Sequence, residues 1–199
     1  MILVVGLGNP GTLYDATPHN LGFRGLDLLA KGMETQGFSL EKRFNALVSV
    51  VRFGREKMIL AKPQTMMNRS GDAVRAIARF YRIETEKIWV FHDDLDLPPG
   101  TFRHSFNSRA AGHRGVQSII DSFGSQRFHR IRIGIGRPER LAAEIFVLRP
   151  MSKMLARETK RTLSDAVNDF SPLLSETLPR HEMEKGSRHH QPPRRPMDK

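Results

Sequence analysis

The sequence predicts an α/β fold, a single three-layer domain in which helices cover both faces of a mixed, mostly parallel sheet. Two observations lead to this prediction. Short apolar runs rich in β-branched residues alternate along the chain with amphipathic segments of helical periodicity. In addition, 199 residues with 39% hydrophobic content are enough for one sizeable core. We assign residues 1–178 to this domain and residues 179–199, which are polar and basic, to a tail that we expect to be disordered.

The first predicted strand, residues 2–5, ends in a turn rich in glycine and proline. The glycines of residues 6–11 match the Gly-x-Gly-x-x-Gly string of dinucleotide-binding folds. That fingerprint requires a helix to begin at the glycines, and Pro10 and Pro18 interrupt one. We therefore interpret the turn as a holder of polar groups and predict no nucleotide cofactor.

The remaining elements follow from the spacing of apolar residues along the chain. Helices are predicted over residues 20–33, 71–81, 115–123 and 152–170, and strands over 47–53, 58–61, 88–91, 128–136 and 142–148. The strands 47–53 and 58–61 flank a short turn and are expected to pair as a hairpin. Ser70 is placed to cap the helix that follows it, because serine is a favoured N-cap residue. Residues 102–111 are polar and are predicted to be irregular.

The net charge of +11 indicates a polyanionic partner. Residues 180–199 contain six Lys/Arg and three Asp/Glu, so 32 − 6 = 26 basic and 21 − 3 = 18 acidic residues leave +8 on residues 1–179. The basic character therefore lies mainly in the folded part. The alternative is a basic surface that keeps the protein soluble without a specific partner.

Several classes of protein are excluded or disfavoured by composition. The absence of cysteine excludes disulfides and thiolate zinc sites. No apolar run approaches the roughly eighteen residues of a membrane helix, and neither a signal peptide nor a transit peptide is visible. We expect a soluble cytoplasmic protein with no membrane association, and a mitochondrial location is the alternative.

Polar residues gather at the carboxyl ends of the predicted strands, where open α/β sheets place their sites. Asn9 and His19 follow the first strand, Asn68 follows the hairpin, and Asp93 follows the strand at 88–91. A histidine can take a proton from water, a carboxylate can fix its tautomer, and amides can donate hydrogen bonds to an oxyanion. This set predicts ester hydrolysis, with His19 as base, Asp93 as the orienting carboxylate, and Asn9 or Asn68 as donor.

Two other chemistries fit the sequence less well. There is no Gly-x-Ser-x-Gly elbow to supply a serine nucleophile. The acidic and histidine side chains of residues 92–96 could ligate a metal, but alternate residues of a strand face opposite ways. We predict neither a metal nor a cofactor.

Six segments of the chain combine glycine, histidine, asparagine and acidic residues in a distinctive order: residues 4–11, 17–20, 66–71, 92–100, 112–115 and 128–136. In this unbroken order they resemble the bacterial-type peptidyl-tRNA hydrolases. The resemblance implies a monomeric α/β enzyme, without metal or obligate protein partner, that hydrolyses the ester between a peptide and the 3′ end of tRNA. It also implies that His19 is the catalytic base, that Asp93 supports it, and that Asn9 helps to tell blocked from unblocked aminoacyl-tRNA. The positions that match substrate or tRNA contacts are Tyr14, Met66, Asn68 and Arg132.

The chain departs from this family at places that bind substrate. Residues 112–115 read Gly-His-Arg-Gly, so Arg114 stands where the family has an asparagine. Ser105 replaces a lysine that grips the acceptor stem, and Arg103 and Arg109 lie close by in the sequence. We expect Arg114 to donate to a phosphate of the 3′ strand. The alternative is that Arg114 points to solvent or pairs with Asp93 or its neighbour Asp94.

The alternative function is a family member that binds RNA without catalysis. The joint presence of His19, Asp93, Asn9 and Asn68 favours the enzyme, because a binding module has no physical need of a base oriented by a carboxylate. In either case phosphate contacts are expected from four arginines, namely Arg103, Arg109, Arg130 and Arg132.

Overall fold

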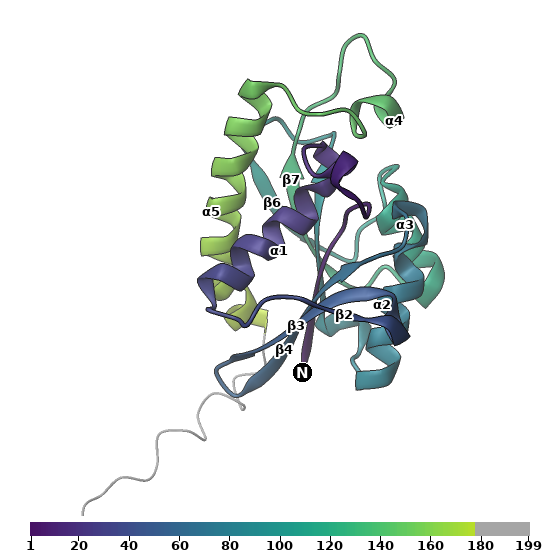
Figure 1. Ribbon diagram of the computed structural model, residues 1–199, viewed down its shortest axis with the longest axis vertical. Coiled ribbons are helices and arrows are strands. Elements are labelled where there is room, and N and C mark those ends of the chain that lie inside the picture. The colour runs from purple at the N-terminus through teal and green to yellow at the C-terminus, as the bar shows by residue number, and fades with distance from the viewer. Residues whose placement is uncertain (178–199) are drawn as a thin grey trace, which may run out of the picture.

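The computed structural model describes residues 1–177, which form one seven-stranded sheet with helices on both of its faces (Figure 1). The strands are β1 (Ile2–Gly6), β2 (Ser39–Glu41), β3 (Ala46–Phe53), β4 (Glu56–Pro63), β5 (Ile88–Asp94), β6 (Phe102–Phe106) and β7 (His129–Gly134). The helices are α1 (Leu21–Gly32), α2 (Ser70–Tyr81), α3 (Arg114–Phe123), α4 (Ala143–Phe146) and α5 (Lys153–Thr177). Short 3-10 turns complete this part, namely η1 (Thr12–Tyr14), η2 (Pro18–Asn20), η3 (Lys42–Phe44), η4 (Met67–Arg69) and η5 (Thr85–Lys87).

The sheet is mixed and parallel at its centre. Its strand order is β2-β3-β4-β1-β5-β7-β6, in which β4, β1, β5 and β7 run parallel while β2, β3 and β6 pair antiparallel. Because parallel strands end at the same edge of a sheet, the segments that follow β1, β4 and β5 meet there. The predicted fold class is confirmed.

Two apolar clusters lie on the two faces of the sheet and define the three layers. One joins the sheet to α1 and α5 through residues such as Leu26, Phe91 and Phe170. The other joins it to α2 and α3 through residues such as Ile77 and Ile119. Strand β5 is buried along its whole length, as the apolar run at its start predicts.

The glycines of the first turn serve close packing between β1 and α1. A side chain at Gly6 would run into the carbonyl of Gly22, and one at Gly22 would run into the backbone of Leu7 and Phe91. A side chain at Gly8 would meet the ring of Phe23. These contacts let α1 begin directly against the strand ends, which places η2 and His19 at the edge of the sheet. Gly6 and Gly8 therefore have a packing role, whereas Gly11 is needed for its positive φ of 100°.

Most predicted elements are confirmed, including α1, α2, α3, α5 and the β3–β4 hairpin. Residues 102–106 are a correction, because they form strand β6, whose backbone bonds to β7. Residues 143–146 are another, because they form helix α4 where a strand was predicted. Ser70 does not cap α2, since it is the first residue of the helix and its hydroxyl donates to the Met67 carbonyl over 2.9 Å. Strand β2 was not anticipated.

Two further expectations concern the C-terminal tail and the absence of a membrane-spanning helix. The predicted basic tail, residues 179–199, lies outside the described residues. Within residues 1–177, no helix is both long enough and apolar enough to cross a membrane.

Candidate active site

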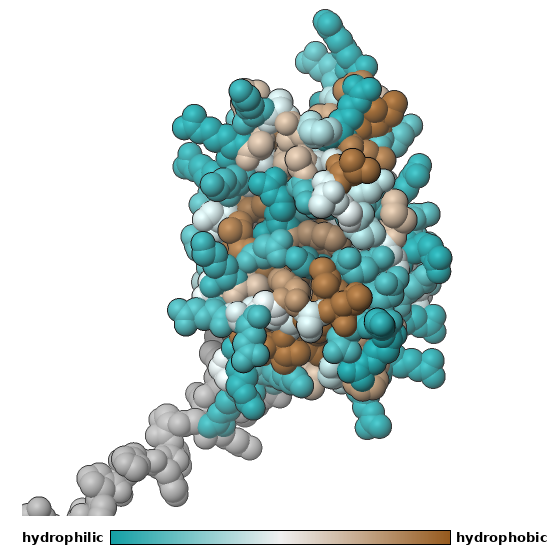
Figure 2. Space-filling model, viewed as in Figure 1, coloured by the Kyte–Doolittle hydropathy of each residue, from teal (hydrophilic) through white to brown (hydrophobic). Residues whose placement is uncertain are grey.

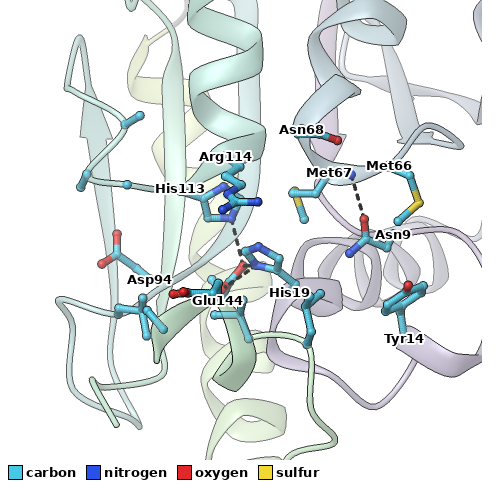
Figure 3. A pocket seen from close by; sticks show the side chains of 18 of the residues that line it. Asn9, Tyr14, His19, Met66, Met67, Asn68, Asp94, His113, Arg114 and Glu144 are labelled. Atoms are coloured by element: carbon cyan, nitrogen blue, oxygen red, sulfur yellow. Dashed lines mark hydrogen bonds and ion pairs between the residues drawn. The ribbon is translucent and has the colours of Figure 1, made fainter. Parts of the chain in front are cut away.

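A cavity of about 410 Å³ opens at the carboxyl edge of the sheet. The turn after β1, η1, η2, η4, the end of β5, the start of α3 and the α4 segment all contribute to its wall. In Figure 3, Asp94 and His113 lie on one side and Asn9, Tyr14 and Met66 on the other, with the His19 ring between them. The structure therefore brings together the residues that the sequence placed at separate strand ends.

His19 and Asp93 form a hydrogen-bonded pair in the wall of this cavity. The Nδ1 atom of His19 lies 3.0 Å from both carboxylate oxygens of Asp93, whose side chain is only 2% exposed. The backbone N–H of His19 donates to the Val147 carbonyl over 3.1 Å, which fixes η2 against the α4 segment. A carboxylate at Nδ1 keeps the proton on that atom, so Nε2 of the neutral ring is left as a base.

His113 lines the cavity and contacts Asp93, and it was missing from the predicted set. Its Nδ1 accepts from the backbone N–H groups of Gly115 and Val116, at 3.1 and 3.3 Å, and so caps helix α3. An Nδ1 that accepts two hydrogen bonds carries no proton, so the proton of the neutral ring lies on Nε2. That Nε2–H donates to Oδ1 of Asp93 over 3.0 Å. The carboxylate thus accepts from two imidazole rings.

The charge on Asp93 is set by opposing effects. Burial raises the pKa of this carboxyl group, while the charges and hydrogen bonds of His19 and His113 lower it. The net result holds the pKa of Asp93 well below its usual range, so the group is an acceptor for both rings at neutral pH.

Asn9 is held so that its amide donor faces the cavity. Its Oδ1 accepts from the backbone N–H of Met67 over 2.8 Å. Its own backbone is clamped by Asn20, whose Oδ1 accepts from Asn9 N–H over 2.8 Å and whose Nδ2 donates to the Asn9 carbonyl over 3.0 Å. Since Oδ1 is occupied, Nδ2 is the group that Asn9 can offer to a ligand. Asn20 was not singled out from the sequence, although it adjoins His19.

Comparison with known proteins agrees with this geometry. The family described as peptidyl-tRNA hydrolase matches residues 3–193 of the chain. The chain belongs to the peptidyl-tRNA hydrolase family. It is 47% identical over 138 residues to the peptidyl-tRNA hydrolase of Syntrophomonas wolfei, and the aligned region covers 69% of this chain and 74% of that one. It is 43% identical over 169 residues to that of Exiguobacterium, covering 84% and 90%.

Solved peptidyl-tRNA hydrolases share the fold. One, in complex with n-propanol, superposes with a TM-score of 0.82 at 31% identity and covers 89% of both chains. The enzyme from Acinetobacter baumannii gives a TM-score of 0.76 at 32% identity, over 89% of this chain and 93% of that one.

The other residues that the peptidyl-tRNA hydrolase resemblance singled out fall into two groups. Tyr14, Met66, Asn68 and Arg114 line the cavity. Arg103 and Arg132 do not line it, but they are cross-strand partners on β6, the edge strand, and β7, which pairs with β5. Residues from three separate segments of the chain therefore line the cavity together with His19, and two basic residues lie further along the sheet.

The arginines expected at phosphates differ in how much of their charge is free. Arg103 and Arg109 are exposed. Arg132 donates from Nε to Oδ2 of Asp94 over 2.7 Å, so part of its charge is compensated. The expectation that Arg130 contacts a phosphate was wrong, because this residue is only 2% exposed. Burial also lowers its pKa to about 10.

Arg114 is the first residue of α3 and is exposed at the cavity. The alternative of a pair with Asp93 or Asp94 is not supported, because those carboxylates accept from the two histidines and from Arg132. Among residues 1–177 no ion-pair partner of Arg114 is found. Its charge is available to a ligand that enters the cavity.

The side chains of His19, Asp93 and His113 could in principle hold a metal ion, since their ligand atoms lie within 4.8 Å of one another. The tautomer of His113 argues against this use. A metal would need the lone pair of Nε2, and the ring proton would then have to sit on Nδ1, opposite two backbone N–H donors. This arrangement in a peptidyl-tRNA hydrolase suits a proton relay better than a metal.

Proposed function

We propose that this chain hydrolyses the ester bond that joins a peptide, or an N-blocked amino acid, to the 3′ end of tRNA, and so recycles the tRNA. The observation that carries the proposal is the His19–Asp93 pair, buried at the wall of a cavity that also offers the Asn9 amide. Membership of the peptidyl-tRNA hydrolase family supports the substrate.

In this mechanism His19 acts as a general base. Its Nε2 takes a proton from a water molecule, whose oxygen attacks the ester carbonyl carbon. Asp93 steadies the imidazolium that forms, and the amides of Asn9 and Asn68 donate to the oxyanion. When the tetrahedral intermediate collapses, the bond to the ribose oxygen breaks and the imidazolium returns its proton to that oxygen. The products are a carboxylic acid, which releases its proton to solvent, and a tRNA with an intact 3′ terminus.

The other residues receive roles in binding. We assign Tyr14, Met66 and Asn68 to the peptide and the terminal nucleotide, and Arg103 and Arg132 to phosphates of the acceptor stem. Asn9 is assigned the further role of telling blocked from unblocked substrates. We also propose that the protein acts as a monomer, without metal, cofactor or obligate protein partner, on peptidyl-tRNA in the cytoplasm.

The reaction is tested by comparing two substrates that differ only at the α-amino group. N-acetylaminoacyl-tRNA is expected to be cleaved through many turnovers, and the same aminoacyl-tRNA with a free amine far more slowly. Equal cleavage of both substrates would remove the assigned role of Asn9. Tight binding of both without cleavage would favour the RNA-binding alternative. We favour the enzyme because burying a carboxylate between two histidines costs free energy, and a protein that only binds RNA has no need of such a group.

Arg114→Ala is expected to raise KM and to leave kcat largely unchanged, because a phosphate contact contributes to binding in ground state and transition state alike. The salt dependence of binding should weaken by about one phosphate contact, a slope change of roughly 0.7 to 0.9. Arg114→Lys is the matched control, since it keeps the charge but not the planar fork. An unchanged KM, or a many-fold rise of kcat in Arg114→Asn, would contradict this assignment.

Binding of tRNA is expected to weaken steeply with added salt, because each phosphate contact releases counterions. A chain truncated after residue 179 should retain most of its affinity, since residues 1–179 carry +8 of the net +11. Filter binding at several salt concentrations measures both effects. Affinity that does not respond to salt, or that is lost with residues 180–199, would show that residues 1–179 are not the main site of contact.

A further inference from the structure

Three arginines lie on the outer face of α2 and at its C-terminal end. Arg75 and Arg79 are four residues apart, so their side chains emerge on one side of the helix, and Arg82 is the left-handed residue (φ 54°) that ends it. All three are exposed, whereas Val74 and Ile77 face the core. Figures 1 and 2 show α2 at the lower right of the molecule, where hydrophilic side chains cover its edge. We call these three residues the α2 arginine row.

The charge of the α2 arginine row is not compensated by neighbouring acids. Within residues 1–177 none of its members has an ion-pair partner, and the nearby Asp72 is engaged by Arg69 over 3.1 Å. By contrast, the exposed Arg127 is paired with Glu86. Helix α3, which packs beside α2, has no Lys or Arg after its first residue.

The α2 arginine row is connected to the cavity by the helix on which it lies. Helix α2 follows η4, whose residues Met67 and Asn68 line the cavity, and its Gly71 lies against the backbone of Ser118 in α3. The 12-residue helix is about 18 Å long, and the row occupies the half of it that is further from the cavity. Basic residues near a helix C-terminus also interact favourably with the helix dipole, but Arg75 lies in the middle of α2 and is not explained in this way.

We infer that the α2 arginine row binds phosphates of the base-paired arm of tRNA, beyond the 3′ end that enters the cavity. The inference rests on the proposed function, because it names a second contact surface for the same substrate. Arginines at this spacing form a strip of positive charge that complements the regular negative charge of one nucleic-acid strand. Such contacts fix the position of the substrate without reading its sequence.

The test replaces all three residues in one protein, Arg75→Gln, Arg79→Gln and Arg82→Gln, and measures two substrates. Full-length N-acetylaminoacyl-tRNA should bind at least about tenfold more weakly at low salt, and its salt slope should fall by about 2 to 3. A short N-acetylaminoacyl oligonucleotide that ends in the same 3′ sequence, but lacks the paired arm, should be cleaved as by the parent. Circular dichroism and Tm establish that the exposed substitutions leave the fold intact.

The matched control removes the same charge from the opposite face of the sheet, where Arg157, Lys160 and Arg161 are exposed on α5. Their replacement by glutamine should change tRNA affinity much less than loss of the α2 arginine row. Equal weakening by both triple variants would overturn the inference, because the effect would then come from net charge alone. Unchanged affinity, or an equal loss on the short substrate, would also overturn it. Failure of the parent protein to cleave either substrate would instead refute the proposed function. In that case, the affinity of the parent and the triple variant for deacylated tRNA would still test the α2 arginine row.

Discussion

His19→Ala is expected to lower kcat by about 10²- to 10⁴-fold, the range that a positioned general base contributes. The loss should fall on kcat and kcat/KM alike, because the proton is taken only in the transition state. Affinity for tRNA should stay near that of the parent, since the ring is 9% exposed and the charged groups proposed for phosphates lie elsewhere. Steady-state hydrolysis and filter binding measure the two quantities on the same preparation.

His104→Ala is a suitable control for this variant. His104 is a partly exposed histidine on β6, bonded to His129 over 2.9 Å and absent from the cavity wall. It should keep the parent rate. Parent-level cleavage by His19→Ala would end the general-base mechanism, whatever the binding data.

Asp93→Asn is expected to lower kcat by about 10²-fold, toward the lower end of the same range. The amide oxygen can replace only one carboxylate oxygen, and the amide N–H₂ at the other position would face Nδ1–H of His19, which lies 3.0 Å from both oxygens. Two donors cannot pair, and the amide therefore favours the tautomer of His19 that carries its proton on Nε2 and is not a base at that atom. Asp96→Asn, at an exposed carboxylate paired with Arg137, is the matched control.

A double variant separates a role through His19 from an independent role. If Asp93 acts only by orienting His19, the combination of His19→Ala and Asp93→Asn should be no slower than His19→Ala alone. Multiplicative losses would contradict the assigned role and would give Asp93 a contact of its own with the reacting groups.

The main features of the fold follow from the sequence because they depend on local periodicity. The buried run that begins β5 and the 3.6-residue spacing in α2 each specify an element without reference to the rest of the chain. Polar β6 could not be predicted in this way, since an edge strand needs only a partner for its backbone, and β7 supplies it. Helix α4 has four residues, which are too few for a helical spacing of apolar residues to be recognised in the sequence.

The site was predictable to the extent that strand ends converge. His19, Asp93 and Asn9 were placed correctly because the carboxyl ends of parallel strands share one edge. His113 was missed because its contacts come from tertiary geometry: one ring nitrogen caps α3 and the other reaches Asp93, twenty residues away. The signal in the sequence that could have pointed to His113 is its place between Gly112 and the start of a predicted helix. The alternation in β7 likewise could not reveal that Arg130 is buried.

The central claim, that water activated in this cavity cleaves the ester, is tested most directly by hydrolysis of N-acetylaminoacyl-tRNA in ¹⁸O-labelled water. Both products are analysed by mass spectrometry after many turnovers. The mechanism predicts far more product than enzyme, with one ¹⁸O in the released carboxylate and none in the tRNA. Label in the tRNA would contradict attack at the acyl carbon. Product formation no faster than without protein, at saturating tRNA binding, would contradict the enzyme itself and leave a protein that only binds RNA.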